Sequence, residues 1–164
     1  MQIELADSVA TENLGRALAR GLPERTQGLV VYLRGELGAG KTTCARAMLR
    51  SLGVTGLIRS PTYTLVEVYA LGVRHFVHVD LYRLVDPEEV GNLGLRDYLV
   101  PEHILLIEWP EKGGGLPRPD LVITLTYTAG GRQAVLRADC ECGKRWLSNL
   151  ERDNSLTPYV SNLT

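Results

Sequence analysis

The chain has 164 residues, 45% of them hydrophobic and 23% charged, and its 18 basic and 19 acidic residues leave a net charge of −1. These values are those of one ordinary globular domain, and they exclude a disordered, collagen-like or coiled-coil chain. No apolar run approaches the ~18 residues of a membrane-spanning helix, so we expect no membrane association. A protein that grips nucleic acid mainly through its phosphates would be more basic.

The sequence gives no indication of secretion. Met1–Asp7 contains acidic residues and lacks the basic start and apolar block of a secretory signal. Three cysteines do not complete a disulfide framework, and Cys44 lies in a helix-like stretch where burial is expected. Cys140 and Cys142 form a C-x-C pair, for which a zinc site is the alternative interpretation. Such a site needs about four ligands. We therefore expect a reduced, cytoplasmic protein.

Strand-like and helix-like stretches alternate along the chain. After a first short strand, Asp7 or Ser8 can cap a helix whose apolar residues recur at every fourth position. The next strand, 28–34, is almost entirely apolar, which is typical of a central parallel strand covered on both faces. Alternating stretches on either side of Gly130–Gly131 predict a hairpin. In chain order, we expect strands at 2–5, 28–34, 64–69, 75–80, 104–109, 121–127 and 133–138, and helices after Asp7, at 41–52, after Asp86 and at 144–150.

The fold class follows from this alternation. Parallel strands that are joined by helices, with antiparallel strands at the edge, predict an α/β three-layer domain with a mainly parallel central sheet and antiparallel edge strands. We expect a single domain over residues 1–152 and a flexible, polar C-terminal tail over residues 153–164.

A phosphate-binding pattern lies between the apolar strand and the following helix. Residues 35–42 read Gly-Glu-Leu-Gly-Ala-Gly-Lys-Thr and match G-x-x-x-x-G-K-[ST] in full. In this pattern, backbone N–H groups and a helix N-terminus face the phosphates, the lysine bridges the β- and γ-phosphates, and the hydroxyl binds Mg²⁺. The strand-to-helix context favours this interpretation over a chance glycine-rich turn. The residues expected to bind nucleotide are Gly35, Gly38, Ala39, Gly40, Lys41 and Thr42.

Two acidic residues each close an apolar strand. Asp80 ends the stretch 76–80, and Glu108 ends the stretch 104–108. Ligands of open α/β sheets gather at the carboxyl ends of the strands, so both carboxylates are expected beside the phosphates. We expect them to serve Mg²⁺ and the attacking water, although the spacing leaves open which acid does which. Two ordinary solvated strand ends are the alternative.

Two further segments have two interpretations each, and a third has one. The hydroxyls of Ser60–Thr64, including Thr62, either reach Mg²⁺ or the γ-phosphate, as switch loops do, or form a plain turn. Arg83, which follows Tyr82, either contacts phosphate or makes a surface pair. Trp109 follows Glu108 and, by local chemistry alone, is a packing residue.

Several of these segments occur together in one order. They are Gly35–Thr43, Ser60–Leu65, His78-x-Asp80-x-Tyr82-Arg83, Asp86-Pro87-Glu88-Glu89, Leu93–Tyr98 and Glu108-Trp109-Pro110-Glu111. In this combination the chain resembles the bacterial TsaE (YjeE) family, the ATPase of tRNA threonylcarbamoyladenosine biosynthesis, over roughly residues 7–137. Glu36 is a mild departure, because an Asp is common at that position of the family.

The resemblance implies a P-loop NTPase fold and a weak, Mg²⁺-dependent ATPase. It also implies action with the TsaD–TsaB pair, which transfers the threonylcarbamoyl group, so that ATP hydrolysis resets the complex and tRNA is reached only through the partners. Residue by residue, it assigns Lys41, Thr42 and Thr43 to phosphate and Mg²⁺, Asp80 and Glu108 to Mg²⁺ or water, Thr62 to a switch-like loop, and Tyr82, Arg83 and Trp109 to positions near nucleotide or partner. Thr11 and Arg132 are expected to flank the base.

Two other classes of function stay open. A small-molecule kinase shares the phosphate-binding loop, but it usually has an Arg-rich lid, and the arginines here are scattered. A nucleotide-dependent binding switch would have a bound partner as its output, whereas two acids at the site favour turnover. No Asn-Lys-x-Asp guanine motif is present, which favours ATP. We therefore expect ATP hydrolysis with the phosphoryl group passed to water.

Overall fold

The computed structural model describes residues 1–23, 28–156 and 159. Its strands are β1 (Gln2–Leu5), β2 (Leu29–Gly35), β3 (Val66–Leu71), β4 (Arg74–Asp80), β5 (Ile104–Glu108), β6 (Leu121–Thr128) and β7 (Gly131–Arg137). Its α-helices are α1 (Ser8–Arg20), α2 (Lys41–Ser51) and α3 (Glu141–Glu151), and its 3₁₀ helices are η1 (Pro87–Leu93), η2 (Leu95–Tyr98) and η3 (Pro110–Lys112).

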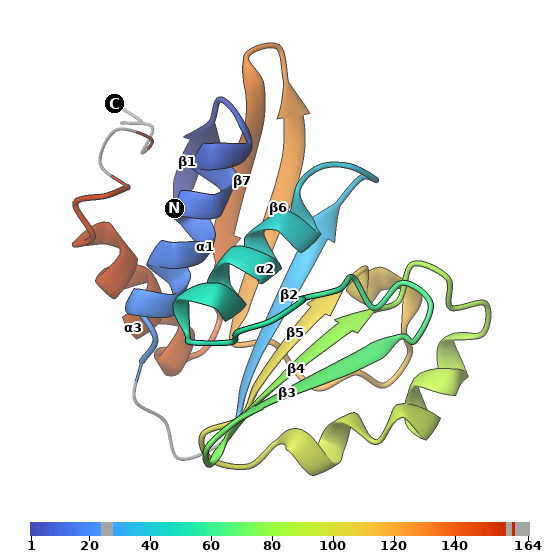
Figure 1. The fold of residues 1–164 in the computed structure, drawn as a ribbon. Helices are drawn as coiled ribbons and strands as arrows, with labels where there is room; N and C mark the ends of the chain where they lie inside the picture. Colours follow the sequence, from blue (N-terminus) through green and yellow to red (C-terminus); the bar gives the residue numbers. More distant parts are fainter. Residues whose placement is uncertain (24–27, 157–158, 160–164) are drawn as a thin grey trace.

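The strands form one mixed sheet of seven strands in the order β1-β7-β6-β2-β5-β4-β3 (Figure 1). The four central strands, β6, β2, β5 and β4, run parallel to one another. The outer pairings, β1 with β7, β7 with β6 and β3 with β4, are antiparallel. The predicted α/β fold, with a parallel centre and antiparallel edges, is confirmed.

Alternation along the strands sorts apolar side chains into two buried clusters, one on each face of the sheet. α1, α2 and α3 cover the first face, where their apolar residues pack with Leu33 and Leu106 of the sheet. The second cluster includes Val79 and Ile107, and η1 and η2 contribute Val90 and Leu95 to it. The second covering layer is therefore made of short 3₁₀ helices.

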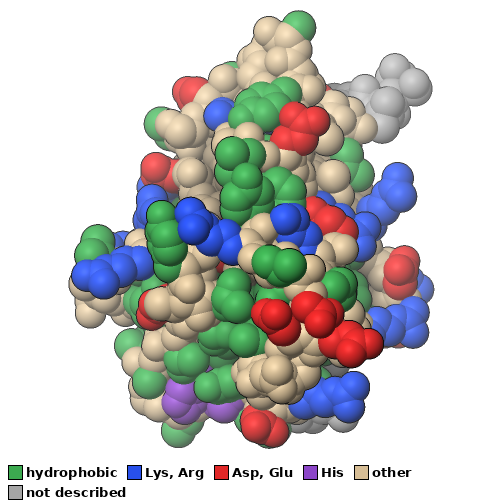
Figure 2. All heavy atoms as spheres, turned by 90° about the vertical axis from the view of Figure 1, so that its right-hand side faces the viewer, with side chains coloured by type: hydrophobic (Ala, Val, Ile, Leu, Met, Phe, Trp, Pro, Cys, Tyr) green, Lys and Arg blue, Asp and Glu red, His purple; other side chains and the backbone are tan. Residues whose placement is uncertain are grey.

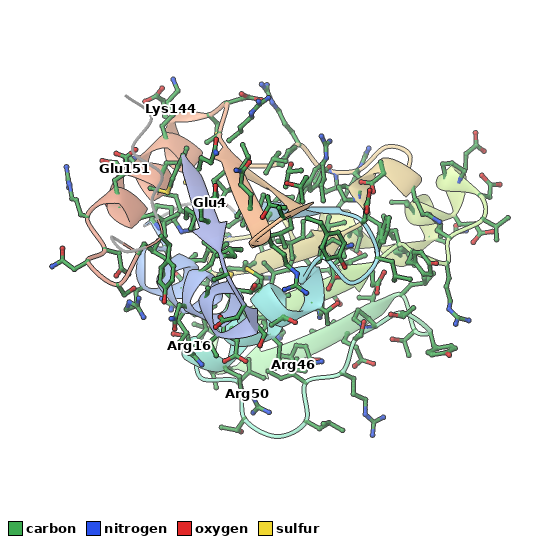
Figure 3. All side chains as sticks on the ribbon, turned by 90° about the horizontal axis from the view of Figure 1, so that it is seen from above. Glu4, Arg16, Arg46, Arg50, Lys144 and Glu151 are labelled. Atoms are coloured by element: carbon green, nitrogen blue, oxygen red, sulfur yellow. The ribbon has the colours of Figure 1, made fainter. Side chains whose placement is uncertain are left out.

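The sequence of α1 explains why this segment forms a helix. The Asp7 side chain caps it by accepting a hydrogen bond of 2.8 Å from the backbone N–H of Ala10. Its apolar stripe is buried, while Arg16 is exposed on the outer side of the helix, as are Arg46 and Arg50 on α2 (Figure 3). Among the described residues, none of the helices is both long and apolar enough to cross a membrane.

Several elements differ from those expected, and three of the differences have a clear local cause. β3 begins at Val66 instead of residue 64, because Leu65 adopts a positive φ of 63° that a strand cannot contain. The helix after Asp86 is a 3₁₀ helix that ends at Leu93, and Gly94 follows it with a φ of 62°. The last helix begins at Glu141, three residues early, because the Cys140 thiol caps it by accepting a hydrogen bond from Gly143.

The start of the C-terminal tail, residues 153–156, is packed against the domain, whereas the sequence predicted a flexible tail there. Asp153 forms an ion pair of 2.8 Å with Arg20 of α1, and Leu156 is completely buried in the first cluster. The hydroxyl of Tyr159 accepts a hydrogen bond from Asn13. Tail residues 157–158 and 160–164 lie outside the described residues.

Candidate functional site

The loop between β2 and α2, which we call the glycine-rich loop (35–42), turns the chain sharply at the carboxyl end of the central strand. Its backbone has a positive φ at Gly35, Gly38 and Gly40. Gly35 has a φ of 135°, and a Cβ there would collide with the backbone oxygen of Leu125. Gly40 has a φ of 105°, and a Cβ there would lie 3.1 Å from the Thr11 methyl group. These close approaches place the N-terminus of α2 at the carboxyl ends of the central strands.

Lys41 lies inside this loop with 5% of its surface exposed. Its Nζ donates hydrogen bonds of 2.7 and 2.9 Å to the backbone oxygens of Gly35 and Glu36, and it lies 3.8 Å from the centre of the Trp109 ring. Burial lowers the pKa of Lys41. The negative charges nearby, chiefly that of Glu108, act in the opposite direction and raise it. The ammonium group is thus held at the loop, close to an acid.

Glu108 closes β5 directly beside β2, in register with Leu33. It is 1% exposed, and each carboxylate oxygen has its own partner. Oε2 accepts a hydrogen bond of 2.9 Å from the Thr42 hydroxyl, and Oε1 lies 2.8 Å from Nε2 of the fully buried His78. The acid therefore joins the first turn of α2 to the sheet.

Asp80 lies opposite Glu108 in the register of β4 and β5 and is 3% exposed. Its Oδ2 accepts hydrogen bonds from the hydroxyls of Thr62, at 2.7 Å, and Ser60, at 3.2 Å. Its Oδ1 accepts a hydrogen bond of 3.0 Å from the backbone N–H of Tyr82. Asp80 thus ties the segment before β3 to the carboxyl ends of the central strands.

A pocket of about 310 Å³ opens over this group. Of the residues expected from the sequence, it brings together Gly38, Gly40, Lys41, Thr42, Thr43, Thr62, Asp80, Tyr82, Glu108 and Trp109, with Leu37 and Ser60 completing the lining. The convergence of Asp80 and Glu108 at this edge of the sheet is as the strand-end argument predicts.

Two expected base contacts, Thr11 and Arg132, lie behind the glycine-rich loop and do not line the pocket. Thr11 is 1% exposed, and its hydroxyl donates to the backbone oxygen of Asp7. Arg132 donates a hydrogen bond of 3.4 Å to the oxygen of Gly38, and its guanidinium lies 5.6 Å from the Tyr127 ring centre. Thr11 approaches the loop from α1, and Arg132 approaches it from the β6–β7 hairpin, which extends at the top of Figure 1.

Aromatic rings form one wall of the pocket. The rings of Tyr82 and Trp109 lie 5.0 Å apart, and Trp109 has a positive φ of 58°, a conformation that is rare for a bulky side chain. Arg83 lies outside the pocket, over the ring of the exposed Tyr63 at 4.1 Å. Lys112, which the sequence argument did not single out, donates to the backbone oxygen of Tyr82.

The oxygen atoms of Thr42, Asp80 and Glu108 are the donor type that Mg²⁺ prefers. Within the described part of the chain, His, Cys, Asp and Glu side chains form no cluster of three or more that could hold a metal ion. A hard cation at this pocket would therefore share the protein oxygens with phosphate oxygens and water, as is usual for Mg²⁺ at nucleotide sites.

Comparison with known proteins decides the family. The family model described as threonylcarbamoyl adenosine biosynthesis protein TsaE matches residues 5–135. The chain belongs to the TsaE family. The resemblance that the sequence motifs carry is thereby confirmed.

Relatives in this family are named tRNA threonylcarbamoyladenosine biosynthesis protein TsaE. The protein of Haemophilus influenzae is 47% identical over 123 residues, which cover 74% of this chain and 78% of the relative. The protein of Nostoc sp. is 42% identical over 141 residues, which cover 82% of this chain and 84% of the relative. The crystal structure of Bacillus subtilus YdiB matches with a TM-score of 0.73 and 25% identity, covering 93% of this chain and 94% of that one.

Proposed function

We propose that the chain is a Mg²⁺-dependent P-loop ATPase that supports threonylcarbamoyladenosine modification of tRNA. In this proposal it binds a TsaD–TsaB transferase pair and resets it through ATP hydrolysis. The observation that carries the proposal is the contact between Thr42 and Glu108 at the end of the glycine-rich loop. It joins a residue suited to Mg²⁺ to an acid on the neighbouring strand, inside a pocket that also contains Lys41 and Asp80.

In the proposed mechanism, backbone N–H groups of the glycine-rich loop bind the ATP phosphates. Lys41 exchanges its hydrogen bonds with the carbonyls of Gly35 and Glu36 for phosphate oxygens and stabilises the charge that develops on the leaving group. Thr42 and Glu108 would hold Mg²⁺, which would supply positive charge to neutralise the phosphates.

Asp80 is the better candidate for orienting the attacking water. Its carboxylate is tied to the hydroxyls of Ser60 and Thr62, whereas Glu108 is tied to Thr42. The water oxygen forms a bond to the γ-phosphorus, and the bond from that phosphorus to the bridging oxygen of ADP breaks. Asp80 accepts a hydrogen bond from that water and so directs its lone pair at the phosphorus.

The charge of the protein fits an indirect route to tRNA. The net charge is −1. On the face shown in Figure 2, basic side chains are interspersed with acidic and hydrophobic ones and form no continuous basic surface. Binding to tRNA through phosphates alone needs a concentrated positive charge. We therefore assign tRNA contact to the partner proteins.

The test is a reconstituted tRNA threonylcarbamoylation assay with purified TsaD and TsaB. Ready-made threonylcarbamoyl-adenylate is supplied, so that its own ATP-dependent synthesis does not contribute. Repeated turnovers should need this chain together with ATP and should stop with a non-hydrolysable ATP analogue. Turnover that is unchanged without the chain would overturn the proposal. Transfer of phosphate from ATP to a small acceptor would indicate the kinase alternative instead.

A further inference from the structure

His78 is the buried polar residue of the site for which the proposed mechanism has no role. It lies in β4, two residues before Asp80, and it is completely buried. Residues two apart in a strand share one face of the sheet, so His78 and Asp80 point to the same side. Because Asp80 pairs with Glu108 in the register, Glu108 is the diagonal neighbour of His78 on that face.

The contact between His78 and Glu108 joins two groups that water does not reach. Nε2 of His78 lies 2.8 Å from Oε1 of Glu108, and the two side chains are 0% and 2% exposed. A buried carboxylate needs hydrogen-bond donors on its oxygens, because burial removes those that water supplied. Glu108 has one such donor on each oxygen, His78 on Oε1 and Thr42 on Oε2.

The two donors to Glu108, Thr42 and His78, differ in how free they are to move. Thr42 lies in the first turn of α2 and lines the pocket, where its hydroxyl can turn toward a ligand. His78 is held inside the central sheet between β3 and β5. When Thr42 turns away from the carboxylate, His78 remains the donor that keeps Oε1 in place, so that Oε2 continues to face the pocket.

The other ring nitrogen indicates which tautomer is present. Nδ1 of His78 is buried and has no hydrogen-bond partner among the described residues. A proton on Nδ1 would leave a buried N–H without an acceptor, whereas an unprotonated Nδ1 leaves only a lone pair without a donor, which is less costly. The ring therefore carries its proton on Nε2 and donates it to Glu108.

We propose that His78 is a positioning residue that holds Glu108 with Oε2 turned toward Thr42 and the phosphate site. The inference rests on the proposed ATPase function and deepens it. His78 touches neither nucleotide nor Mg²⁺ in this proposal, and it acts only through the orientation of Glu108. Partners in this outer position typically change metal affinity or activity by about 10- to 100-fold when they are removed.

The first measurement requires no nucleotide. Imidazole ¹⁵N NMR of the wild-type chain should show His78 with its proton on Nε2, and the resonance should shift in Glu108→Gln. A proton on Nδ1, or a resonance that does not respond to Glu108→Gln, would overturn the proposal, even if a His78 variant failed to fold.

The second measurement uses the variants His78→Leu, which removes the donor, and His78→Gln, which retains an N–H. His75→Leu, at the other end of the same strand, is the matched control. Affinity for a non-hydrolysable ATP analogue is measured by calorimetry in EDTA and in Mg²⁺, together with kcat and KM for ATP. For His78→Leu, we expect affinity in EDTA within about twofold of wild type, and a loss of about tenfold or more in both the Mg²⁺-dependent gain of affinity and kcat.

His78→Gln should recover most of the Mg²⁺-dependent gain of affinity and most of kcat. His75→Leu should change neither the Mg²⁺-dependent gain of affinity nor kcat. An unchanged Mg²⁺ dependence of affinity in His78→Leu would overturn the proposal. A His78→Gln variant as defective as His78→Leu would also overturn it, because lost packing would then explain the defect of His78→Leu. Failure of the proposed function is distinguishable. In that case the wild-type chain itself neither binds nor hydrolyses ATP, while the NMR measurement still reports the contact with Glu108.

Discussion

Buried polar side chains concentrate at one place in this molecule. Among the described residues, the buried polar or charged side chains are Thr11, Lys41, His78, Asp80, Glu108 and Asp120. All except Asp120 lie in or against the pocket and its glycine-rich loop. Burying such groups costs free energy unless each finds a partner. Lys41 donates to the loop backbone, His78 lies against Glu108, and Asp80 accepts from nearby hydroxyls. Such a cluster is the arrangement expected of a site that stabilises developing charge.

At the scale of single residues, the first prediction concerns Lys41. In the proposed mechanism Lys41 stabilises the developing phosphate charge, so Lys41→Ala should lower ATP hydrolysis by about 10²- to 10³-fold. Phosphate release measured with the partner proteins present checks this. Lys144→Ala is the control, since Lys144 lies on α3 with 59% of its side chain exposed (Figure 3) and should leave hydrolysis unchanged. Full multi-turnover tRNA modification by Lys41→Ala would contradict the ATPase role.

The second prediction concerns the reactivity of Cys44. Burial, with a smaller contribution from Glu108, raises the pKa of its thiol from 9.0 to about 12. The thiolate is the reactive form, so alkylation of Cys44 by iodoacetamide at pH 8.5 should be about a thousandfold slower in the folded chain than in guanidinium. Mass spectrometry of the labelled peptides measures this. The half-buried Cys142 is the internal comparison. Equal native rates at Cys44 and Cys142 would contradict the prediction.

The raised pKa also has a consequence for stability. The folded chain holds the Cys44 proton more tightly than the unfolded chain does. The contribution of this thiol to the free energy of unfolding is therefore fully present below pH about 9 and declines as the pH rises toward 12.

At the scale of elements, the contact between α1 and α2 decides where the glycine-rich loop lies. α1 approaches α2 at Gly15, where an added Cβ would collide with the backbone oxygen of Cys44 and lie 2.8 Å from Cβ of Ala47. α1 also carries Thr11, which packs against Gly40 of the loop. The first helix thus supports the start of α2 through close backbone approach.

The third prediction follows from that approach. Gly15→Ala should lower the free energy of unfolding by about 1–3 kcal/mol, because the new methyl group forces α1 away from α2. Urea unfolding followed by circular dichroism measures the change. Gly91→Ala in η1 is the control, since an added Cβ there meets nothing within 4 Å. A Gly15→Ala variant as stable as wild type would show that the two helices separate without cost.

At the scale of the whole molecule, residues far apart in the sequence close the domain around α1. Trp146 of α3 is fully buried and donates a hydrogen bond of 3.0 Å from Nε1 to the backbone oxygen of Leu18. Beyond α3, Asp153 and Ser155 bond to Arg20, and Leu156 is buried in the same cluster as the helices. The start of the tail is therefore part of the core.

The fourth prediction tests this role of the tail. Leu156→Ala should lower the free energy of unfolding by about 2–5 kcal/mol, as expected for a fully buried leucine. Thermal and urea unfolding measure it. Leu57→Ala, at a side chain that is 72% exposed, should change stability by less than about 0.5 kcal/mol. Equal effects of the two substitutions would mean that the tail does not contribute to the core.

Local sequence patterns were enough to predict most of the elements and most of the residues that line the pocket. The apolar run of β2, the glycine-rich loop and the acids that close two strands are local patterns, and local patterns follow from backbone geometry and hydrophobic periodicity. The order of the strands, with β5 between β2 and β4, could not be predicted and emerged from the folded structure. The same holds for the contact of His78 with Glu108, the place of Thr11 and Arg132 behind the loop, and the packing of Leu156. Each of these depends on which distant segments become neighbours, and that choice is made by burial of the whole core, which no spacing along the chain encodes.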